Sequence, residues 1–157
     1  MKEIALTQGQ VALVDDEDYD KMSGRMWQIH TLGYARTTIE GRSCYMHRLV
    51  TNAARDEEID HINGNKLDNR KANLRKATRF QNMQNVGPRY GGNKSSRFKG
   101  VYWDGSTNRW KALLTVARTK HRLGGFRDEI EAARAYDAAA KQHHGDFAWL
   151  NFPNETI

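Results

Sequence analysis

The stretch from residue 59 to residue 85 limits most strongly what this chain can fold into. A run of Asn, Gly and Asn at 63–65 tolerates positive φ, so the chain must turn immediately after Asp60 and His61. These two residues close a short apolar stretch, and residues 74–78 can form a strand that returns beside it. The sequence therefore predicts two strands joined by a loop, with Asp60 and His61 at the rim of the first strand.

A short helix is expected directly after the second strand. Thr78 and Gln81 have the spacing of a capping box, which places the start of the helix at about Arg79. Asn82 then lies in the first turn, and we expect its side chain to face the rim of the first strand. The unit is thus a strand, a loop, a strand and a helix whose polar side chains converge at one end.

These side chains suit the hydrolysis of a phosphodiester. A neutral imidazole such as that of His61 accepts a proton from water near pH 7. The carboxylate of Asp60 and the amide oxygen of Asn82 are ligands that Mg²⁺ prefers. Six basic residues in the same stretch create a field that attracts phosphate. Each residue alone is more often structural, and Asp-His before Asn-Gly also fits an ordinary surface turn, so the functional interpretation depends on the whole set.

The pattern resembles the HNH, or His-Me finger, endonucleases, in particular the homing type of phages and other mobile elements. The residues that carry the resemblance are Asp60, His61, Asn73 and Asn82. Asn73 follows the histidine by twelve residues, and Asn82 follows nine residues later. The resemblance implies that His61 is the base that activates water and that Asn73 orients its imidazole.

The same resemblance implies a metal site. Asp60 and Asn82 are expected to hold one divalent cation, Mg²⁺, for which Mn²⁺ is expected to substitute. Asn82 stands where many members of the family have histidine. This departure matches the asparagine subgroup of the family and favours Mg²⁺ over softer metals.

Basic residues are concentrated in the middle of the chain. Residues 59–127 contain 16 basic and 3 acidic side chains, whereas residues 1–58 contain 7 and 10 and residues 128–157 contain 2 and 6. A charged run is usually just a solvated face, but this excess is interleaved with aromatic residues at 102–110. We therefore expect a polyanion as the partner, and nucleic acid is the leading choice.

The composition excludes several other classes of protein. No apolar run approaches the length of a membrane span, and the N-terminal residues lack the apolar core of a signal peptide. The single cysteine, Cys44, can form neither an internal disulfide nor a multi-cysteine zinc site, and we expect a small buried or strand residue there. A soluble protein without membrane contact is expected, in the cytoplasm of a bacterium or a phage-infected cell.

The first 58 residues predict a small β-rich lead-in to this unit. Residues 2–14 indicate two short strands about Gly9, and the acidic residues that follow predict a helix to about Ser23. Further strands are expected at 27–30, 34–38 and 43–46. The lead-in is expected to complete the core of the unit. Its candidate phosphate contacts are Arg36, Arg42 and Arg48.

His47 precedes His61 by fourteen residues and stands at the head of a predicted short helix. It is able to line the site, but a histidine in such a position is more often packed or hydrogen-bonded within the structure. We favour that structural interpretation. Residues 52–58 are polar enough to form the loop that leads to Asp60.

The composition changes abruptly at residues 86–96, which are rich in Gly, Asn and Ser and predict a linker. We therefore expect a domain at 1–86, a linker at 87–94 and a second domain at 95–153. Strand-like runs at 98–103, 109–117 and 121–126 predict a three-stranded antiparallel sheet.

A helix capped by Asp128 and Glu131 is expected after this sheet, and it should end near Gly145. An alanine-rich stripe along the helix is interpreted as core. Its members are Ala132, Ala135, Tyr136, Ala139 and His143. His143 and His144 are interpreted as packing or surface residues and not as metal ligands.

This second half is similar to the plant ethylene-response-factor, or APETALA-type, DNA-binding domain. The similarity covers residues 95–153 and is most specific in the Glu-Ala-Ala-Arg-Ala-Tyr-Asp run and the terminal Leu-Asn-Phe-Pro. It implies a sheet that enters the major groove of DNA. The candidate contacts are Lys99, Tyr102, Arg109, Trp110, Lys111 and Arg122. Tyr102 replaces the usual arginine and Arg122 the usual tryptophan, so the plant target sequence does not carry over.

Together these features predict an α+β protein of two modules. The first is a ββα-metal unit with a β-rich lead-in, and the second is a three-stranded antiparallel sheet packed on one helix. We expect a Mg²⁺-dependent endonuclease that nicks double-stranded DNA as a monomer. The alternatives are a DNA-binding regulator with a relic nuclease unit and an RNA-binding accessory protein. A relic would lose His61 or its neighbouring ligands, and RNA binding would favour exposed aromatic platforms over a groove-reading strand face.

Overall fold

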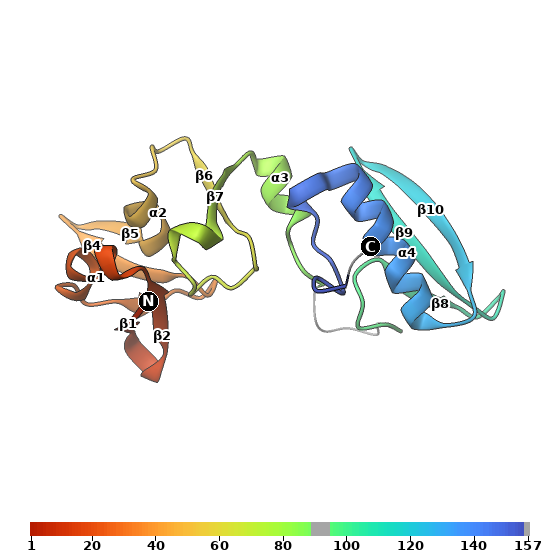
Figure 1. The fold of residues 1–157 in the computed structure, drawn as a ribbon, viewed down its shortest axis with the longest axis horizontal. Coiled ribbons are helices and arrows are strands. Elements are labelled where there is room, and N and C mark those ends of the chain that lie inside the picture. The colour runs from red at the N-terminus through yellow and green to blue at the C-terminus, as the bar shows by residue number, and fades with distance from the viewer. Residues whose placement is uncertain (89–94, 156–157) are drawn as a thin grey trace. The chain divides into compact units, whose positions relative to one another are not determined.

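The chain forms two compact units, Met1–Asn82 and Met83–Ile157, each with a hydrophobic core of its own (Figure 1). The structure is a computed structural model that describes residues 1–88 and 95–155. It is a mixed α+β structure with small antiparallel sheets and few helices, as the sequence predicts. Most of the predicted linker, residues 89–94, lies outside the described residues.

Small sheets and short helices make up the first unit. Its elements in chain order are β1 (Lys2–Ala5), η1 (Thr7–Gly9), β2 (Val11–Val14), α1 (Asp16–Ser23), β3 (Gln28–Ile29), β4 (Ala35–Ile39), β5 (Arg42–Tyr45), α2 (Met46–Thr51), β6 (Glu58–His61), η2 (Lys71–Asn73), β7 (Leu74–Ala77) and the first residues of α3 (Arg79–Gln84), the helix within which the first unit ends. The sheets are β1–β2, β3–β4–β5 and β6–β7, each antiparallel. β6, β7 and α3 follow in the predicted order of strand, loop, strand and helix.

The core of the first unit is supplied mainly by the lead-in. Apolar residues alternate along the β1–β2 hairpin, so Ile4, Ala12 and Val14 are buried while their neighbours are more exposed. Trp27 is buried in the same cluster, and its indole donates a hydrogen bond of 2.8 Å to the carbonyl of Met22. β6 and β7 add one buried residue each to this cluster, so the hairpin that carries the catalytic candidates rests on the lead-in.

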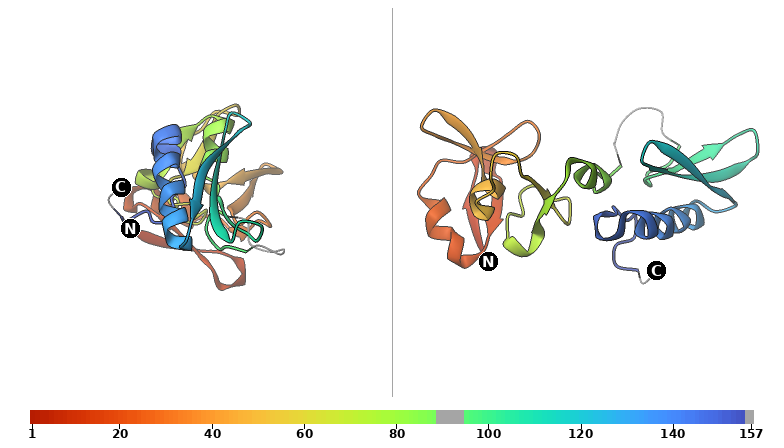
Figure 2. Two further views of the ribbon diagram at one scale, coloured as in Figure 1. Left: turned by 90° about the vertical axis from the view of Figure 1, so that its right-hand side faces the viewer. Right: turned by 90° about the horizontal axis from the view of Figure 1, so that it is seen from above.

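A sheet and a long helix form the second unit. Its elements are β8 (Val101–Asp104), β9 (Arg109–Val116), β10 (Thr119–Phe126), α4 (Glu129–His144) and the 3-10 turn η3 (Gly145–Phe147). The strand order is β10–β9–β8, and α4 lies along one face of the sheet (Figure 2). Asp128 caps α4, because its Oδ1 accepts hydrogen bonds from the backbone N–H groups of Ile130 (2.8 Å) and Glu131 (3.0 Å). The predicted sheet and helix are therefore confirmed.

The face that α4 turns to the sheet differs from the predicted stripe. Its buried residues are Ala132, Ala133, Tyr136, Asp137 and Ala140. The prediction included Ala132 and Tyr136 correctly, but Ala135 and Ala139 are only half-buried and His143 is exposed. The apolar pattern missed Asp137 because this residue is buried for its hydrogen bonds, not for its hydropathy.

Two close contacts fix α4 in this orientation. A Cβ atom on Gly100, which has a φ of +75°, would lie 2.1 Å from the ring of Tyr136, so only glycine allows the ring to lie there. Asp137 accepts hydrogen bonds of 2.8 Å from the backbone N–H groups of Asn151 and Phe152. The C-terminal Leu-Asn-Phe-Pro run is thus attached to the helix.

The structure bears on two expectations that came from the composition, the position of Cys44 and the lack of a membrane span. Cys44 lies in β5 as a half-buried free thiol, in agreement with its interpretation as a strand residue. Among residues 1–88 and 95–155, no helix has the length and apolar character needed to cross a bilayer.

Candidate active site

The catalytic candidates lie where β6 ends and the loop to β7 begins. The antiparallel register places Asp60 opposite Arg75 and His61 opposite Leu74. Asp60 and His61 are each only 4% exposed. Burial lowers the pKa of His61, and the hydrogen bond to Asn69 and the charge of Asp60 act in the opposite direction. The imidazole is therefore neutral at pH 7, as a general base must be.

Asn73 anchors the loop between β6 and β7. Its Oδ1 accepts a hydrogen bond of 3.0 Å from the backbone N–H of Asn63, and its Nδ2 donates one of 2.8 Å to the carbonyl of Asp68. Both ends of the amide are therefore bonded to loop backbone. This geometry does not match the expectation that Asn73 orients the imidazole of His61.

Asn69 is the asparagine that contacts the imidazole. It is completely buried, and its Oδ1 lies 3.4 Å from Nε2 of His61. The amide cannot be turned round, because its Nδ2 donates a hydrogen bond of 3.1 Å to the carbonyl of Leu67. Because an amide oxygen only accepts, this contact favours the tautomer of His61 with the proton on Nε2 and the lone pair on Nδ1. Sequence reasoning missed Asn69, since it stands in a polar run where nothing marks it as buried.

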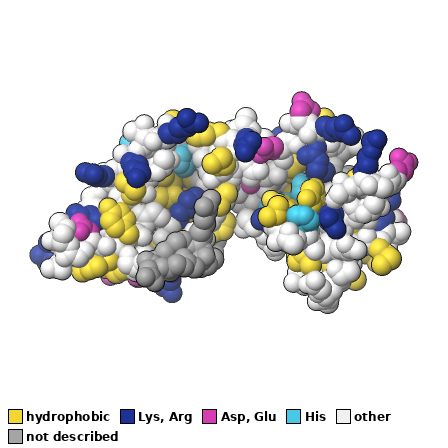
Figure 3. Space-filling view, turned by 180° about the vertical axis from the view of Figure 1, so that it is seen from behind, with side chains coloured by type: hydrophobic (Ala, Val, Ile, Leu, Met, Phe, Trp, Pro, Cys, Tyr) yellow, Lys and Arg dark blue, Asp and Glu magenta, His cyan; other side chains and the backbone are white. Residues whose placement is uncertain are grey.

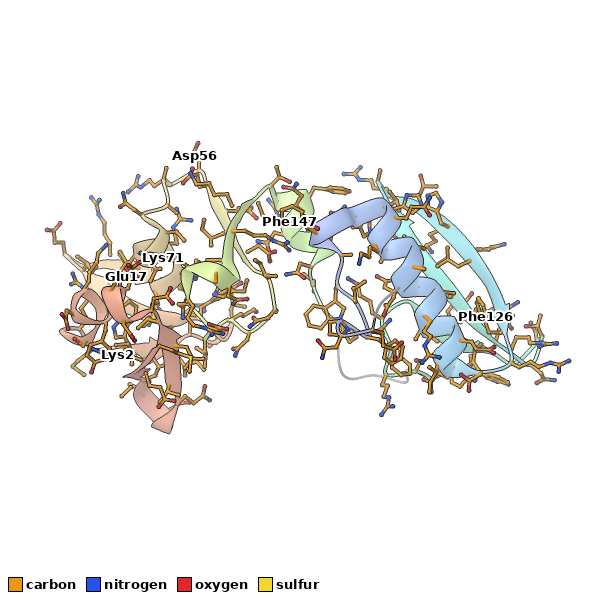
Figure 4. The ribbon with its side chains drawn as sticks, in the orientation of Figure 1. Lys2, Glu17, Asp56, Lys71, Phe126 and Phe147 are labelled. Carbon is orange, nitrogen blue, oxygen red and sulfur yellow. The ribbon has the colours of Figure 1, made fainter. Side chains whose placement is uncertain are left out.

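The loop is also bonded to the lead-in. The backbone N–H of Leu13 in β2 donates to the carbonyl of Leu67, and the N–H of Asn69 donates to the carbonyl of Leu13, both at 2.8 Å. At the end of the loop, Lys71 of η2 and Glu17 of α1 point toward one another and form an ion pair (Figure 4). The lead-in thus holds the loop between β6 and β7 in place, and the loop in turn positions Asn69.

Asn82 reaches β6 from α3, as the sequence predicts. Thr78 and Gln81 form the expected capping box, in which the N–H of Thr78 donates 2.8 Å to Oε1 of Gln81 and the N–H of Gln81 donates 3.2 Å to Oγ1 of Thr78. The Nδ2 of Asn82 donates a hydrogen bond of 3.2 Å to Oε2 of Glu58. Because Glu58 takes the amide nitrogen, the Oδ1 of Asn82 is the atom left to face a cation.

Asp60 forms an ion pair across the hairpin. Nε and Nη2 of Arg75 donate hydrogen bonds of 2.8 Å and 2.7 Å to the same carboxylate oxygen, Oδ2. Glu58 precedes Asp60 by two residues in β6, so their side chains leave the strand on the same face. The face therefore carries two carboxylates, one guanidinium and the amide of Asn82.

The donors on this face fit a hard divalent cation. Asp60 and Asn82 offer oxygen ligands, and Mg²⁺ commonly uses one or two carboxylates together with waters and substrate phosphate. Within the described part of the chain, no group of three or more His, Cys, Asp or Glu side chains is placed to hold a metal ion.

An aromatic cluster packs against His61. The ring of His47 meets that of His61 edge to face with centroids 5.2 Å apart, and it stacks on Tyr45 at 5.6 Å. The centroid of the Tyr34 ring lies 5.1 Å from that of His47 and 5.8 Å from that of His61. Burial and the nearby His61 lower the pKa of His47 to about 3, so its ring is also neutral. The sequence favoured a packed role for His47. In the structure His47 is buried, and its ring packs against that of His61.

The basic candidates of the lead-in lie in different environments. Arg48 is used internally, because Nη1 donates 2.7 Å to the carbonyl of Glu57 and Nη2 donates to that of Ala54. Its assignment as a phosphate contact is therefore not supported by its position. Arg36 is half-buried and donates 3.3 Å to Oε1 of Gln28, whereas Arg42 in β5 is exposed. Figure 3 shows Lys and Arg side chains on the visible surface of each unit taken by itself.

A groove of about 440 Å³ lies on the sheet of the second unit. Its lining residues are Tyr102, Asp104, Lys111, Ala112, Arg122, Gly124 and Gly125. Ala112 and Leu114 of β9 are buried against α4, so Lys111 beside them projects from the opposite face. Gly125 leaves room for it, since a Cβ there would lie 2.9 Å from its Nζ. The structure thus brings together three of the predicted contacts, Tyr102, Lys111 and Arg122.

The other predicted contacts of the second unit lie elsewhere. Trp110 packs against the core and meets Trp103 edge to face at 5.2 Å, because it leaves β9 on the same face as Ala112. Lys99 is half-buried, and its Nζ donates 2.9 Å to the carbonyl of Gln84. Burial lowers the pKa of Lys99 to about 8. Arg109 is half-exposed at the start of β9. Trp110 and Lys99 thus both make contacts within the protein, and their contact with DNA stays a prediction.

Comparison with known proteins assigns a family to this geometry. The sequence profile of the HNH endonuclease family matches residues 44–84, which include all four residues of the predicted motif. A protein of Acanthamoeba polyphaga mimivirus named as an uncharacterized HNH endonuclease is 30% identical over 149 residues, which cover 91% of this chain and 75% of the viral protein. Protein 3.8 of Escherichia phage T7 is 30% identical over 90 residues, which cover 57% of this chain and 72% of the phage protein.

A different relative matches only a part of the chain. An AP2/ERF and B3 domain-containing protein of Oryza sativa subsp. japonica is 45% identical over 60 residues, which are 38% of this chain and 16% of the plant protein. This partial match points weakly to a DNA-binding domain. The match to the viral protein, in contrast, extends over most of both chains. The chain therefore belongs to the HNH endonuclease family and is a DNA endonuclease, a hydrolase of phosphodiester bonds.

Proposed function

We propose that this chain is a metal-dependent nicking endonuclease of the homing type that hydrolyses one phosphodiester in double-stranded DNA. The single observation that carries the proposal is the state of His61. The contact with Asn69 favours the tautomer of this buried ring that carries its proton on Nε2 and its lone pair on Nδ1. A buried neutral imidazole in this tautomer is suited to remove a proton from water.

Each neighbouring residue has a part in this mechanism. His61 takes a proton from the attacking water at Nδ1. Its Nε2–H group meanwhile stays hydrogen-bonded to Oδ1 of Asn69. Asp60 and the Oδ1 of Asn82 would hold the cation, with Mg²⁺ as the first choice and Mn²⁺ as a substitute. When bound, such a cation polarises the scissile phosphate and stabilises the leaving oxygen.

We propose further that the second unit attaches the nuclease to duplex DNA. The groove with Tyr102, Lys111 and Arg122 supports this role, since it combines an aromatic side chain with two cations on the sheet face opposite α4. The proposed domains are a nuclease at 1–86 and a DNA-binding domain at 95–153, joined by residues 87–94. One catalytic centre cuts one strand, so a monomer bound to DNA is expected to nick it.

Cleavage of supercoiled plasmid tests the proposal. The protein is expected to convert supercoiled DNA to open circles with Mg²⁺ and not with a chelator. His61→Ala should slow this conversion by about 10²- to 10⁴-fold, because it removes a general base. DNA affinity, measured by gel shift, should be nearly unchanged, since no phosphate contact is lost. Linear product formed without an open-circle precursor would contradict nicking, and an unchanged rate in the variant would remove His61 from the mechanism.

A further inference from the structure

The ion pair between Asp60 and Arg75 is largely shielded from solvent, so screening by water is reduced. The side chains are 5% and 17% exposed, respectively, and the register of β6 and β7 places them directly opposite each other. Two hydrogen bonds from the guanidinium end on one oxygen, Oδ2. The residue proposed as a metal ligand is therefore already bound to a fixed positive charge in the protein without DNA.

This arrangement opposes the binding of a divalent cation to the free protein. A cation at Asp60 would lie within a few ångströms of the guanidinium, and their repulsion is large in a poorly screened site. The cation would also compete with two charge-assisted hydrogen bonds for the carboxylate. Glu58 on the same face adds a second negative charge, but it is bonded to Asn82. Net attraction for a divalent cation is thus much smaller than two carboxylates would suggest.

A phosphodiester changes this balance. Its oxygens accept two parallel hydrogen bonds from a guanidinium, as a carboxylate does, and its negative charge attracts the cation as well. When Arg75 transfers these hydrogen bonds to the phosphate, it no longer competes with the metal for the carboxylate of Asp60. The backbone of the hairpin need not move, because only side-chain hydrogen bonds are exchanged.

We propose that Arg75 couples metal binding to DNA binding, by neutralising Asp60 in the free protein and turning to a phosphodiester in the complex. This inference rests on the proposed function, in that it takes Asp60 as a metal ligand. It has a thermodynamic consequence: DNA raises the affinity for the metal by the same factor by which the metal raises the affinity for DNA. The complete cutting centre then exists only on DNA.

Titration calorimetry with Mn²⁺ tests the coupling without any cleavage. The protein carries His61→Ala so that the DNA stays intact, and Mn²⁺ is titrated with and without a short duplex taken from the plasmid that the wild-type protein nicks. DNA is expected to tighten Mn²⁺ binding by about tenfold or more, within the usual range of such couplings. With Arg75→Gln added, Mn²⁺ binding to the free protein should tighten by about tenfold, and most of the effect of DNA should disappear. An unchanged DNA effect in this variant would overturn the proposal.

Matched variants separate the role of Arg75 from a general effect of positive charge on β7. Lys76→Gln removes the same charge from the next residue of the strand, whose side chain is 70% exposed and pairs with Glu57, and it should leave the coupling intact. An equal loss of coupling in Lys76→Gln would overturn the proposal. Arg75→Lys keeps the positive charge and replaces Arg75→Gln in the titration if the Gln variant does not fold. It should bind Mn²⁺ weakly without DNA and show a reduced DNA effect, because lysine cannot form two parallel bonds. A full DNA effect in Arg75→Lys would count against the proposal.

The failure of the proposed function is distinguishable in the same experiment. Asp60→Ala should abolish Mn²⁺ binding with and without DNA. If this variant binds Mn²⁺ like its parent in both conditions, Asp60 is not a ligand and the proposed function fails. If Asp60→Ala abolishes binding but Arg75→Gln leaves the coupling unchanged, only the inference about Arg75 fails.

Discussion

Two buried asparagines four residues apart have different functions in this site. Asn69 accepts a hydrogen bond from the ring of His61, whereas Asn73 satisfies an N–H and a carbonyl of the loop. The first contact favours one tautomer of His61, the proposed base. The second determines the shape of the loop that holds Asn69. Catalysis and stability are therefore expected to respond differently to the loss of each amide.

Substitution of these asparagines should separate the two effects. Asn69→Leu is expected to slow single-turnover nicking by about 10- to 100-fold, because the imidazole loses the acceptor that fixes its tautomer. Asn73→Ala is expected to lower the free energy of unfolding by about 1–3 kcal/mol, because buried backbone groups lose their partners. Urea denaturation and nicking rates on both variants provide the measurement. If Asn73→Ala slows nicking at full stability and Asn69→Leu does not, the two assignments must be exchanged.

His47 provides a test that depends on pH. The pKa of His47 is about 3 in the folded chain, whereas an unfolded chain has the ordinary value of about 6.5. Between these values the unfolded chain binds a proton that the folded chain does not, so stability is full above the higher pKa and falls as the pH is lowered. The expected slope is about 1.4 kcal/mol per pH unit for this one group.

His47→Phe should flatten this slope while keeping a ring against His61. The measurement is the urea midpoint of both proteins at several pH values between 4 and 7. The buried His61 contributes in the same direction in both proteins, so the difference between the two curves reports His47 alone. Parallel curves would show that His47 is charged in the folded state or that the site opens in acid.

At the scale of elements, locally determined features were predictable from the sequence. The helix α3 follows from the Thr78–Gln81 capping box, and the hairpin β6–β7 follows from the Asn-Gly-Asn turn. These signals lie within a few residues of the structure that they specify. The sheet of the second unit has strong alternation and polar turns, and it was equally predictable.

The contacts that define the site were not predictable in this way. Asn69 meets His61 because β2 holds the loop, and His47 meets His61 because α2 follows β5 in the core. The first contact depends on β2, which is far from the loop in sequence, and the second joins side chains of two separate elements, α2 and β6. Neither contact has a local pattern. Arg48 has a structural role that its sequence context does not reveal. A basic residue in a basic protein looks like a phosphate contact, yet its guanidinium holds the carbonyls of residues 54 and 57.

Arg48 and Arg42 therefore form a matched pair for testing. Arg48→Ala should lower the free energy of unfolding by about 1–3 kcal/mol, because carbonyls in the loop before β6 lose a charged donor. Arg42→Ala should leave stability almost unchanged, weaken DNA binding and reduce its salt slope by about one unit if the exposed side chain contacts phosphate. Denaturation and DNA binding at several salt concentrations provide the measurements. A reduced salt slope in a fully stable Arg48→Ala protein would restore Arg48 as a DNA contact.

At the scale of the whole molecule, the chain combines two units that have separate cores. The nuclease candidates all belong to the first unit, and the groove with Lys111 and Arg122 belongs to the second. Linking two weak DNA-binding modules raises the effective concentration of the second once the first is bound. The gain reaches about 10²- to 10⁴-fold when the linker lets both bind at once.

Removal of the second unit tests this division. A fragment of residues 1–86 is expected to nick DNA at high protein concentration, because the core of the first unit and the catalytic candidates are retained. Its DNA binding should be weaker and its choice of site less selective. In the full chain, Arg122→Ala should reproduce part of this loss and cost about 1–3 kcal/mol of binding free energy if the side chain reads a base edge.

The decisive measurement is the distribution of nicks made by the fragment and by the full chain on one long DNA at the same salt concentration. Thermal unfolding of the fragment serves as the control for its folding. A broader distribution for the fragment would assign site selection to the second unit. In that case Arg122→Ala should relax the base preference at particular positions of the nicked site. If Arg122 contacts only phosphate, the variant should instead bind all sites more weakly by the same factor. An identical distribution would mean that the nuclease unit selects the site and that the second unit contributes affinity only.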